Sequence, residues 1–504
     1  MKILEFGTTE QFAALRRFLA DIGYREPRIC EKLGLPSAEA LDIIALSENL
    51  KEKVTSAEPL NAIIRLFLLG EFVFIEEAET QFPGSAWAAM NALGLIEDDP
   101  DDGKRCFGSV ALYPVGDLFI VSDRWSNPDH KPKQSFPDIV YPALTKSTRE
   151  FLRFLPNDAR GNFLELCGGS GIAALAASRT AQHAWASDIT ERSTRFAEFN
   201  VALNGRSNVT AVQGDLYSAV EEQRFDRIAA HPPYMPVLRP AEIYYDGGED
   251  GEQLTRRIVE GLQRHLNPGG RLYCRTLGTD REEAPFERRL RGWLGNAEGE
   301  FDIAVFISKN LDIVRFATDS AIRRSTGLAE VNQWRALFER LHVKEILTGM
   351  VVVQRREEIR PVFTIRRSLA PNVDSAATEA VLRWETELAA SRSLDKILGM
   401  KPIASPQTEL VVRHRIEEGG FIPKDFTLTS EYPFLMDCSV QPWMGYLLVH
   451  CDGSKSIQEL YGECREAGWI DPNAPPREFV ELIGLLVSGG FLRVEEINSP
   501  AATE

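Results

Sequence analysis

FLELCGGSGIAAL, residues 163–175, is typical of a buried strand followed by a glycine-rich turn and the start of a helix. Glycine is needed in such a turn because a side chain would keep backbone N–H groups away from a bound cofactor, and because the turn uses positive φ angles. A glycine-rich turn alone is weak support for any one fold. The elements that follow it in the sequence therefore decide the prediction.

Apolar strands alternate with amphipathic helices from about residue 139 to residue 368, as expected for a mostly parallel sheet covered on both faces. The predicted strands are residues 162–166, 184–187, 210–213, 227–230, 271–275, 303–307 and 345–355. Their number fits a doubly wound sheet. The sequence therefore predicts an α/β fold.

Three acidic residues, Glu165, Asp188 and Asp215, end or follow three successive predicted strands. Open α/β folds bind ligands at the carboxyl edge of the sheet, where these acids would meet, and Asp188 lies where an acid contacts a ribose hydroxyl. A single aspartate is often only a solvated loop residue, but three in register favour a site. No glycine trio with dinucleotide-binding spacing is present, which disfavours a nicotinamide dehydrogenase.

This order of glycines and acids resembles the class I, Rossmann-like S-adenosylmethionine-dependent methyltransferases, over roughly residues 139–280. The resemblance implies that Glu165 lies beneath the methionine part of the cofactor, that Asp188 binds the ribose hydroxyls, and that Asp215 meets the adenine amino group. Further cofactor contacts are expected from Cys167, Gly168, Gly169, Gly171, Leu216 and His231. Many members have glycine in place of Cys167, which we interpret as a small turn residue and not as a nucleophile.

The segment 140–148, VYPALTKST, precedes the first strand by one helix. It resembles the segment that closes over the cofactor in this family, so Tyr141, Pro142 and Thr145 are predicted to line the site. In the alternative interpretation, Thr145 or Ser147 only caps the helix predicted at residues 148–155.

The run His231-Pro232-Pro233-Tyr234 follows the strand at residues 227–230. Two consecutive prolines form a rigid turn without N–H donors, and its carbonyl groups can accept hydrogen bonds. The run resembles the Asn-Pro-Pro-Tyr motif of methyltransferases that act on amino groups of glutamine, guanine or adenine. The resemblance implies that the first side chain and the first proline carbonyl accept hydrogen bonds from a planar NH2 group, while the tyrosine ring stacks on its face. These four residues are the predicted catalytic residues.

Two glycine-rich segments downstream, residues 245–251 and 266–272, resemble those of the glutamine and small-domain N-methyltransferases. Histidine at position 231 departs from the usual asparagine. A neutral imidazole can accept one hydrogen bond, but it can also take a proton near neutral pH. A histidine beside prolines can equally be structural only. The leading hypothesis is therefore methyl transfer to a planar nitrogen of a protein side chain or nucleobase. The alternatives are an O- or C-methyltransferase of a small metabolite with His231 as general base, and a cofactor-binding regulatory protein.

Regions on both sides of the methyltransferase-like core have their own patterns. Residues 1–125 are predicted to be a helical, winged-helix-like module, residues 126–370 the methyltransferase domain, and residues 371–504 a module that ends in a second winged-helix-like unit. The expected linker is residues 123–137. The amino-terminal elements are helices at 10–22, 25–33, 60–69 and 85–93 and a hairpin of strands 108–113 and 118–122. A helix at 376–390, capped by Ser375, is expected to precede a weakly patterned region. The tail is predicted to be helical at 457–467 and 477–488, with a strand at 491–494.

The chain has 504 residues, too many for one ordinary core, and its 44% hydrophobic and 26% charged residues are typical of packed globular domains. The net charge of −17 disfavours a protein that wraps nucleic acid. Seven scattered cysteines without a Cys-x-x-Cys pair predict neither disulfides nor a metal site. Without a recognisable secretory signal or long apolar run, we expect a cytoplasmic protein and no membrane partner. The mixed-charge run 281–291 is expected to be a solvated helix face. The methyl acceptor and the oligomeric state stay open.

Overall fold

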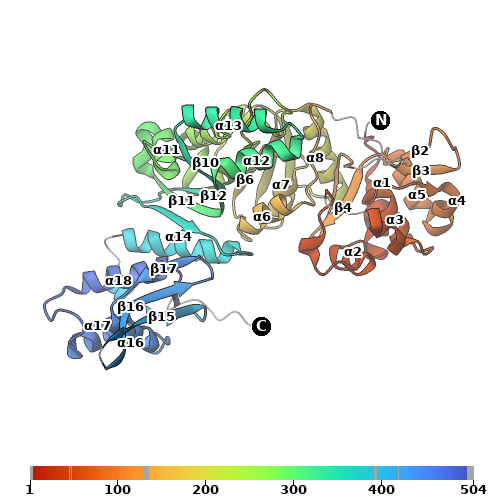
Figure 1. Cartoon of the computed structure of the whole chain (residues 1–504). Coiled ribbons are helices and arrows are strands. Elements are labelled where there is room, and N and C mark those ends of the chain that lie inside the picture. The colour runs from red at the N-terminus through yellow and green to blue at the C-terminus, as the bar shows by residue number, and fades with distance from the viewer. Residues whose placement is uncertain are drawn as a thin grey trace. The chain divides into compact units, whose positions relative to one another are not determined.

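The computed structural model describes residues 4–44, 46, 48–125, 128, 136–390, 394–417 and 419–495 (Figure 1). Much of the expected linker, residues 126–127 and 129–135, lies outside the described residues. The chain divides into two compact units, one made of Met1–Thr279 with Ile313–Val343 and the other of Asp280–Asp312 with Lys344–Glu504. The three-module division stays a prediction.

The amino-terminal part of the first unit is helical, as predicted. Its helices are α1 (Thr9–Asp21), α2 (Glu26–Leu33), α3 (Pro59–Phe67), α4 (Ile75–Gln81) and α5 (Gly84–Ala92). Helix α1 begins at a capping box, in which the Thr8 hydroxyl accepts from Gln11 N and Gln11 Oε1 accepts from Thr8 N. A small sheet in the order β1-β3-β2 joins them, with strands β1 (Val73–Phe74), β2 (Ile96–Asp98) and β3 (Arg105–Gly108). The winged-helix-like description stays a prediction.

A two-stranded hairpin joins the helical region to the core of the first unit. It consists of β4 (Ala111–Val115) and β5 (Leu118–Ser122), and it turns at Gly116, whose φ of 61° suits glycine. Two asparagines of helix α8 (Glu191–Asn204) bind the β5 backbone: Asn200 Oδ1 accepts from Val121 N at 2.8 Å, and Asn204 Oδ1 accepts from Phe119 N at 2.9 Å. These amide contacts continue the sheet hydrogen bonding of β5 onto a helix.

Five parallel strands of the first unit position the site. They are β6 (Asn162–Leu166), β7 (His183–Asp188), β8 (Val209–Gln213), β9 (Phe225–Ala230) and β10 (Leu266–Arg281), in the order β10-β9-β6-β7-β8. Because all five run in one direction, their carboxyl ends meet at one edge of the sheet. The predicted acids end or follow three of these strands.

The strands β11 (Phe301–Leu311), β12 (Val343–Arg355) and β13 (Thr364–Ser368) complete an eight-stranded sheet with the order β13-β11-β12-β10-β9-β6-β7-β8. Strand β11 is antiparallel to β12 and parallel to β13. The doubly wound, mostly parallel α/β fold predicted from the sequence is therefore confirmed. Strand β13 was not among the predicted strands.

Helices cover the sheet of the first unit. They include α6 (Lys146–Phe154), α7 (Ile172–Ala177), α8, α9 (Gln253–Glu260) and α10 (Leu262–His265). Helix α8 ends at Gly205, which takes the left-handed conformation expected of a helix stop. Two more helices of this unit, α12 (Ile313–Arg324) and α13 (Leu328–Arg340), lie between β11 and β12 in the sequence.

The second unit begins with α11 (Phe286–Trp293) and continues through α14 (Ser375–Ala389). Asp374, and not the predicted Ser375, caps α14 by accepting a hydrogen bond from Ala377 N at 3.1 Å. The mixed-charge run at α11 is also less solvated than predicted, because Arg291 Nη2 donates to Phe363 O at 3.0 Å and burial lowers the pKa of its guanidinium.

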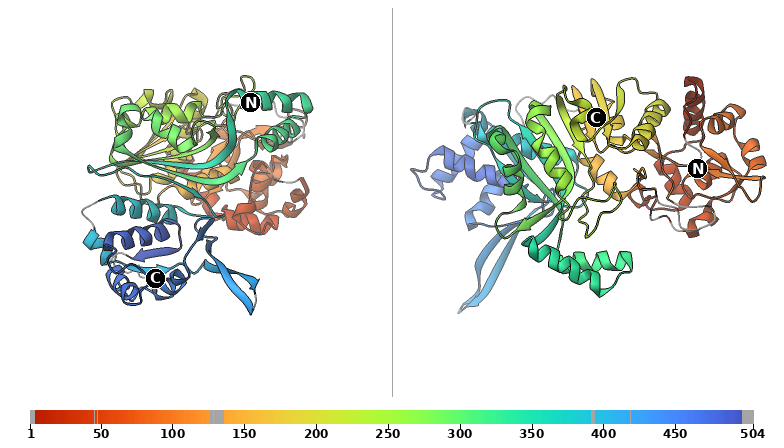
Figure 2. Two further views of the ribbon diagram at one scale, coloured as in Figure 1. Left: turned by 60° about the vertical axis from the view of Figure 1, so that its left-hand side comes forward. Right: turned by 90° about the horizontal axis from the view of Figure 1, so that it is seen from above.

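The weakly patterned region contains a long antiparallel hairpin that sequence analysis missed. Figure 2 shows its two strands, β15 (Thr408–Glu417) and β16 (Gly420–Ser430), as a projecting ribbon, and β17 (Met436–Ser439) pairs with β16. Most side chains of β15 are exposed on both faces, so the strand has no alternation of polar and apolar residues.

The carboxyl-terminal elements agree with the predicted tail. They are α15 (Leu394–Leu398), α16 (Pro442–His450), α17 (Ile457–Glu466) and α18 (Pro476–Ser488), with β14 (Lys401–Ala404) paired to β18 (Leu492–Glu495). Helix α17 begins at a capping box between Ser456 and Glu459. Among the described residues, no helix is long and apolar enough to cross a membrane.

Candidate active site

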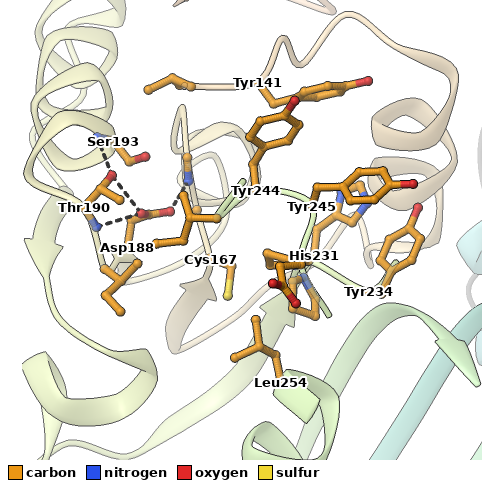
Figure 3. Close-up of a pocket in the computed structure, with 18 of the residues that line it drawn as sticks. Tyr141, Cys167, Asp188, Thr190, Ser193, His231, Tyr234, Tyr244, Tyr245 and Leu254 are labelled. Carbon is orange, nitrogen blue, oxygen red and sulfur yellow. Dashed lines mark hydrogen bonds between the residues drawn. The ribbon is translucent and has the colours of Figure 1, made fainter. Parts of the chain in front are cut away.

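A cavity of about 680 Å³ lies in the first unit and is lined by residues from the carboxyl ends of its strands (Figure 3). It brings together most of the residues that the sequence predicted. The predicted residues that line it are Tyr141, Pro142, Glu165, Cys167, Gly168, Gly169, Asp188, Asp215, Leu216, His231, Pro232, Pro233 and Tyr234. Thr145 and Gly171 do not line it.

Glu165, near the end of β6, is the most buried of the three acids and is 3% exposed. Its carboxyl oxygens accept hydrogen bonds from the first turn of α7, Oε1 from Ala173 N at 3.1 Å and Oε2 from Ala174 N at 2.8 Å. Burial nevertheless raises the pKa of this carboxyl to about 7. Glu165 therefore joins strand to helix and titrates close to neutral pH.

Asp188 is held by three hydrogen bonds at the end of β7. Its Oδ2 accepts from Gly169 N at 2.9 Å, while Oδ1 accepts from Thr190 N at 3.0 Å and from the Thr190 hydroxyl at 3.2 Å (Figure 3). The Thr190 hydroxyl in turn accepts from Ser193 N at 3.0 Å and caps α8. The carboxylate is thus fixed in orientation on the cavity wall.

The glycine-rich turn uses left-handed backbone angles. Gly169 has a φ of 52°, and a Cβ added there would meet no atom within 4 Å, so its face toward the cavity is open. Gly171 has a φ of 75° and begins α7, where a Cβ would lie 3.1 Å from Ala197 Cβ. Cys167 shares the turn at a φ of 55°, and burial raises the pKa of its thiol well above the ordinary range. The thiol therefore stays protonated.

Asp215 follows β8 and is paired with an arginine that sequence analysis did not predict. Arg257 Nη2, on α9, lies 2.8 Å from Asp215 Oδ2, and both residues line the cavity. The next residue, Leu216, has a φ of 52°, and its carbonyl accepts from the Ser187 hydroxyl at 3.1 Å. This bond ties the third acid to the end of β7.

Thr145 and Tyr141 differ in their placement. Thr145 is buried and caps α6, where its hydroxyl accepts from Thr148 N at 3.4 Å, as in the alternative interpretation of this segment. Tyr141 lines the cavity and stacks on Tyr244, with ring centroids 5.7 Å apart and an interplanar angle of 26°. Burial raises the pKa of Tyr141 to about 12, so it stays neutral.

His231 begins the double-proline turn directly after β9. Its ring lies nearly parallel to that of Tyr234, with centroids 5.7 Å apart and an interplanar angle of 13°, and 5.2 Å from the ring of Phe151. Burial, with a smaller contribution from the charge of Arg275, lowers the pKa of His231 to about 3. The imidazole is therefore neutral at ordinary pH and can accept a hydrogen bond.

The glycine-rich segment 245–251 packs tightly on the turn. Met235 N donates to Tyr245 O at 3.3 Å, and Gly247 N donates to Met235 O at 2.9 Å. A Cβ at Gly247 would lie 2.8 Å from the Tyr234 backbone, and one at Gly251 would lie 2.5 Å from the Tyr234 carbonyl oxygen. Only glycine permits this approach, so the segment fixes the position of the turn.

The side chains gather at two ends of the cavity (Figure 3). We name Asp188, Thr190 and Ser193 the acid end, and His231, Tyr234 and Tyr245 the turn end. Cys167 lies between them. A ligand that occupies both ends would therefore pass along the glycine-rich turn.

Several residues that line the cavity were not predicted from the sequence. These are Ile189, Thr190, Ser193, Met235, Ile243, Tyr244, Gln253, Leu254, Arg257 and Arg323. Tyr244 adjoins the quoted segment 245–251, and Thr190 stands two residues after Asp188 in a capping position; both signals were available. Nothing local pointed to Arg257 or Arg323. Among the described residues, no group of three or more histidine, cysteine or acidic side chains could hold a metal ion.

Comparison with known proteins gives consistent relatives. Residues 141–298 match the methyltransferase small domain family. A ribosomal protein uL3 glutamine methyltransferase from Bradyrhizobium diazoefficiens is 32% identical over 164 residues, which cover 30% of this chain and 51% of the relative. A release factor glutamine methyltransferase from Thermodesulfovibrio yellowstonii is 32% identical over 132 residues, 24% of this chain and 47% of the relative.

Among solved structures, a ribosomal protein L11 methylase from Lactobacillus delbrueckii subsp. bulgaricus is 20% identical, with a TM-score of 0.24, and covers 42% of this chain and 77% of that one. The chain spans about half the length of the two curated relatives it matches. Residues 141–298 contain the glycine-rich turn, the three acids and the double-proline turn. This region is therefore similar to the methyltransferase small domain family and to glutamine methyltransferases, as the resemblance of its motifs predicted.

Proposed function

We propose that this protein transfers a methyl group from S-adenosylmethionine to the amide nitrogen of a glutamine side chain in another protein. The single observation that carries the proposal is the neutral His231 ring, stacked parallel to Tyr234 in the same cavity as the three acids. The similarity of residues 141–298 to glutamine methyltransferases supports the same substrate class.

The acid end fits the ribose and methionine parts of the cofactor. Gly169 leaves open space at the cavity wall, and Asp188 is oriented there by three donors. We assign the ribose hydroxyls to Asp188, the methionine part to the region above Glu165, and the adenine edge to Asp215 and Leu216. Cys167 and Gly168 would line the path between the ends. When bound, this cofactor supplies the methyl group, which leaves the sulfonium sulfur as the substrate nitrogen bonds to carbon and releases a proton.

Thr145 and Gly171 are proposed to position residues that line the cavity without lining it themselves. Thr145 caps α6 and fixes the segment that carries Tyr141, while Gly171 allows α7 to begin close to α8. Neither touches the cavity. Their contribution to cofactor binding is therefore indirect.

The turn end fits a planar amide. His231 and the Pro232 carbonyl would accept the two hydrogens of the NH2 group, and the Tyr234 ring would stack on its face. Pro233 makes the turn rigid, because it fixes φ and lacks an N–H group. Holding the nitrogen at the methyl carbon in this way is most of what methyl transfer requires.

General-base catalysis on a hydroxyl is the less favoured reaction. A base is most effective when its pKa lies near the working pH. Burial keeps the pKa of His231 at about 3, so its imidazole has little tendency to take a proton near neutral pH. A hydrogen-bond acceptor needs no such proton affinity.

The test is incubation of the full chain with tritium-labelled S-adenosylmethionine and a bacterial extract, followed by peptide mass spectrometry. We expect label on protein, located at the side-chain amide of glutamine. Tyr234→Ala, which removes the stacking ring, is the matched control and should abolish the label. Label found only on small metabolites, or on oxygen or carbon atoms, would overturn the proposal.

A further inference from the structure

We infer that the α12–α13 helical hairpin is a docking surface for the protein substrate, and that Arg323 on this hairpin selects an acidic side chain near the target glutamine. This inference rests on the proposed function, because it names the kind of segment that enters the turn end.

The hairpin is a separate element with its own core. Phe316 on α12 meets Trp334 and Phe338 on α13, with ring centroids 5.4 and 5.6 Å apart. Although α12 and α13 lie between β11 and β12 in the sequence, the hairpin belongs to the same compact unit as the cavity. Sheet formation does not require an insertion of this length, since β11 and β12 pair antiparallel and a short turn can join them.

The hairpin reaches the site at two points. Arg323, near the end of α12, lines the cavity. Arg340, at the end of α13, lies with its Nη2 2.9 Å from Glu249 Oε1. Glu249 belongs to the segment 245–251 that packs on the backbone of Tyr234. Both side chains of this ion pair are exposed, so the pair shows that the hairpin lies close to the segment but stabilises that arrangement little.

The charge on the cavity wall distinguishes Arg323. Among the described residues, two arginines line the cavity, and Arg257 is paired with Asp215. No hydrogen bond or ion pair involves Arg323 within the described part of the chain, and its side chain is exposed. A guanidinium in this position can donate two parallel hydrogen bonds to the two oxygens of a carboxylate.

The hairpin also exposes apolar side chains. Val314 and Ile322, two turns apart on α12, are 53% and 69% exposed, and Leu328 at the start of α13 is 74% exposed. Exposed aliphatic side chains on one helical hairpin are available to a protein partner. An extended segment with apolar residues and one carboxylate complements both these exposed apolar side chains and Arg323. Because the net charge of the chain is −17, an acidic segment needs a local positive charge for binding, and Arg323 supplies one.

The experiment uses short fluorescent peptides with one central glutamine, each carrying a glutamate at one flanking position, and a matched series with lysine there. Binding to the full chain is measured by anisotropy with S-adenosylhomocysteine present, and methyl transfer is measured separately with labelled cofactor. We expect glutamate at one or two positions to bind about three- to tenfold more tightly than lysine, because an exposed guanidinium attracts glutamate and repels lysine with the modest strength of a surface charge pair.

Three variants make the test specific. Arg323→Gln should remove the preference, and Arg323→Glu should reverse it in favour of lysine. Arg335→Gln, which changes an exposed arginine of the same hairpin that does not line the cavity, should leave it intact. An unchanged preference in Arg323→Glu, or no glutamate preference in the wild type, overturns the inference. So does weaker binding of S-adenosylhomocysteine to Arg323→Gln, because the arginine would then serve the cofactor.

The two proposals can fail separately. If peptides bind with the Arg323-dependent preference but are not methylated, the docking surface stands and glutamine methylation by this chain is contradicted for these segments. If peptides are methylated without any dependence on Arg323, the proposed function stands and the docking inference is wrong.

Discussion

The acid end and the turn end of the cavity are held by different kinds of contact. At the acid end, Asp188 is fixed by hydrogen bonds from Gly169 and Thr190, and Thr190 is only two residues away in the chain. At the turn end, the Tyr234 backbone is fixed by the close approach of Gly247 and Gly251. Hydrogen bonds to its side chain orient Asp188, whereas the close packing of two glycines positions the Tyr234 backbone.

This difference predicts how each end responds to mutation. Replacing a hydrogen-bonded carboxylate removes its own hydrogen bonds only, because the neighbouring residues stay in their helices and strands. A close-packed backbone cannot absorb an added atom without moving, because native interiors have little free space. We therefore expect changes at the acid end to reduce cofactor binding and changes at the turn end to reduce turnover.

Gly247→Ala should have the largest effect. The added Cβ would lie 2.8 Å from two backbone atoms of Tyr234, which have no alternative rotamer. A displacement of about 1 Å at the reacting centre can cost about 10²-fold in rate, and we expect at least that loss of methyl transfer. Binding of S-adenosylhomocysteine, measured by calorimetry, should stay within about threefold because the acid end is untouched.

Gly292→Ala is the matched control. A Cβ at Gly292, in α11, would meet nothing within 4 Å, so this change should leave the rate unaltered. If Gly247→Ala lowered cofactor affinity as much as rate, the two ends would not be independent and the comparison would fail.

Asp188→Ala should have the next largest effect, at the opposite end. Hydrogen bonds to a charged acceptor are worth about 1.5–3 kcal/mol, so cofactor affinity should fall roughly ten- to a hundredfold. Calorimetric titration with S-adenosylhomocysteine measures this directly. Thr190→Val, which removes one of the three donors to the carboxylate and keeps the side-chain shape, should cause a smaller loss. Unchanged affinity in Asp188→Ala would place the cofactor elsewhere.

The contrast between the ends also explains what sequence analysis could predict. The acids Glu165, Asp188 and Asp215 were found because parallel strands bring their carboxyl ends to one edge, so position along each strand was enough. The partner of Asp215 was not found. Arg257 lies on α9, 42 residues further along the chain, and its pairing depends on how that helix packs.

The stacking of Tyr141 on Tyr244 was missed for the same reason, because residues from two distant loops meet only in the folded chain. The hairpin β15–β16 was not predicted for a different reason. Exposure on both faces removes the alternation that identifies a strand, and register comes from pairing between strands, which no single segment encodes. Sequence therefore predicted contacts set by topology better than contacts set by packing.

His231→Asn should have a small effect, because it restores the side chain of the usual motif while keeping an acceptor at the turn end. We expect activity within about tenfold of the wild type, against a loss of about 10²–10⁴ if the histidine were a general base. Burial lowers the pKa of His231 to about 3, so protonation occurs only in strong acid and the wild-type rate should show no acidic limb near the ordinary histidine pKa of about 6.5. A loss of activity of about 10²-fold or more in His231→Asn, together with a fall of the wild-type rate as the pH drops through about 6.5, would falsify the proposal of methyl transfer to nitrogen.

The smallest expected effect is on stability, at the buried Glu165. Burial raises the pKa of its carboxyl from 4.5 to about 7, so between these values the folded state binds more protons than the unfolded state. The stability that this group contributes is fully present below about pH 4.5 and is lost as the pH rises through about 7. Glu165→Gln, which cannot ionise, should lack this loss.

The measurement is the melting temperature of both proteins at pH values on either side of this window. In acid the wild-type carboxyl is protonated, and Glu165→Gln replaces one of the two oxygens that accept from the α7 N–H groups with an NH2 group. The variant should therefore melt lower than the wild type in acid, and the gap between the two melting temperatures should narrow as the pH rises. If the gap between the two melting temperatures narrows by about 2–4 °C, the difference in free energy of unfolding has changed by about 1 kcal/mol for a domain of about 150–250 residues. Glu222→Gln, a change at a side chain that is 95% exposed, should preserve the wild-type dependence. A constant gap would mean that the Glu165 carboxyl ionises with the same pKa in the folded and unfolded protein, because its two backbone donors offset the cost of burial. Glu165 would then add one negative charge to the cavity at neutral pH.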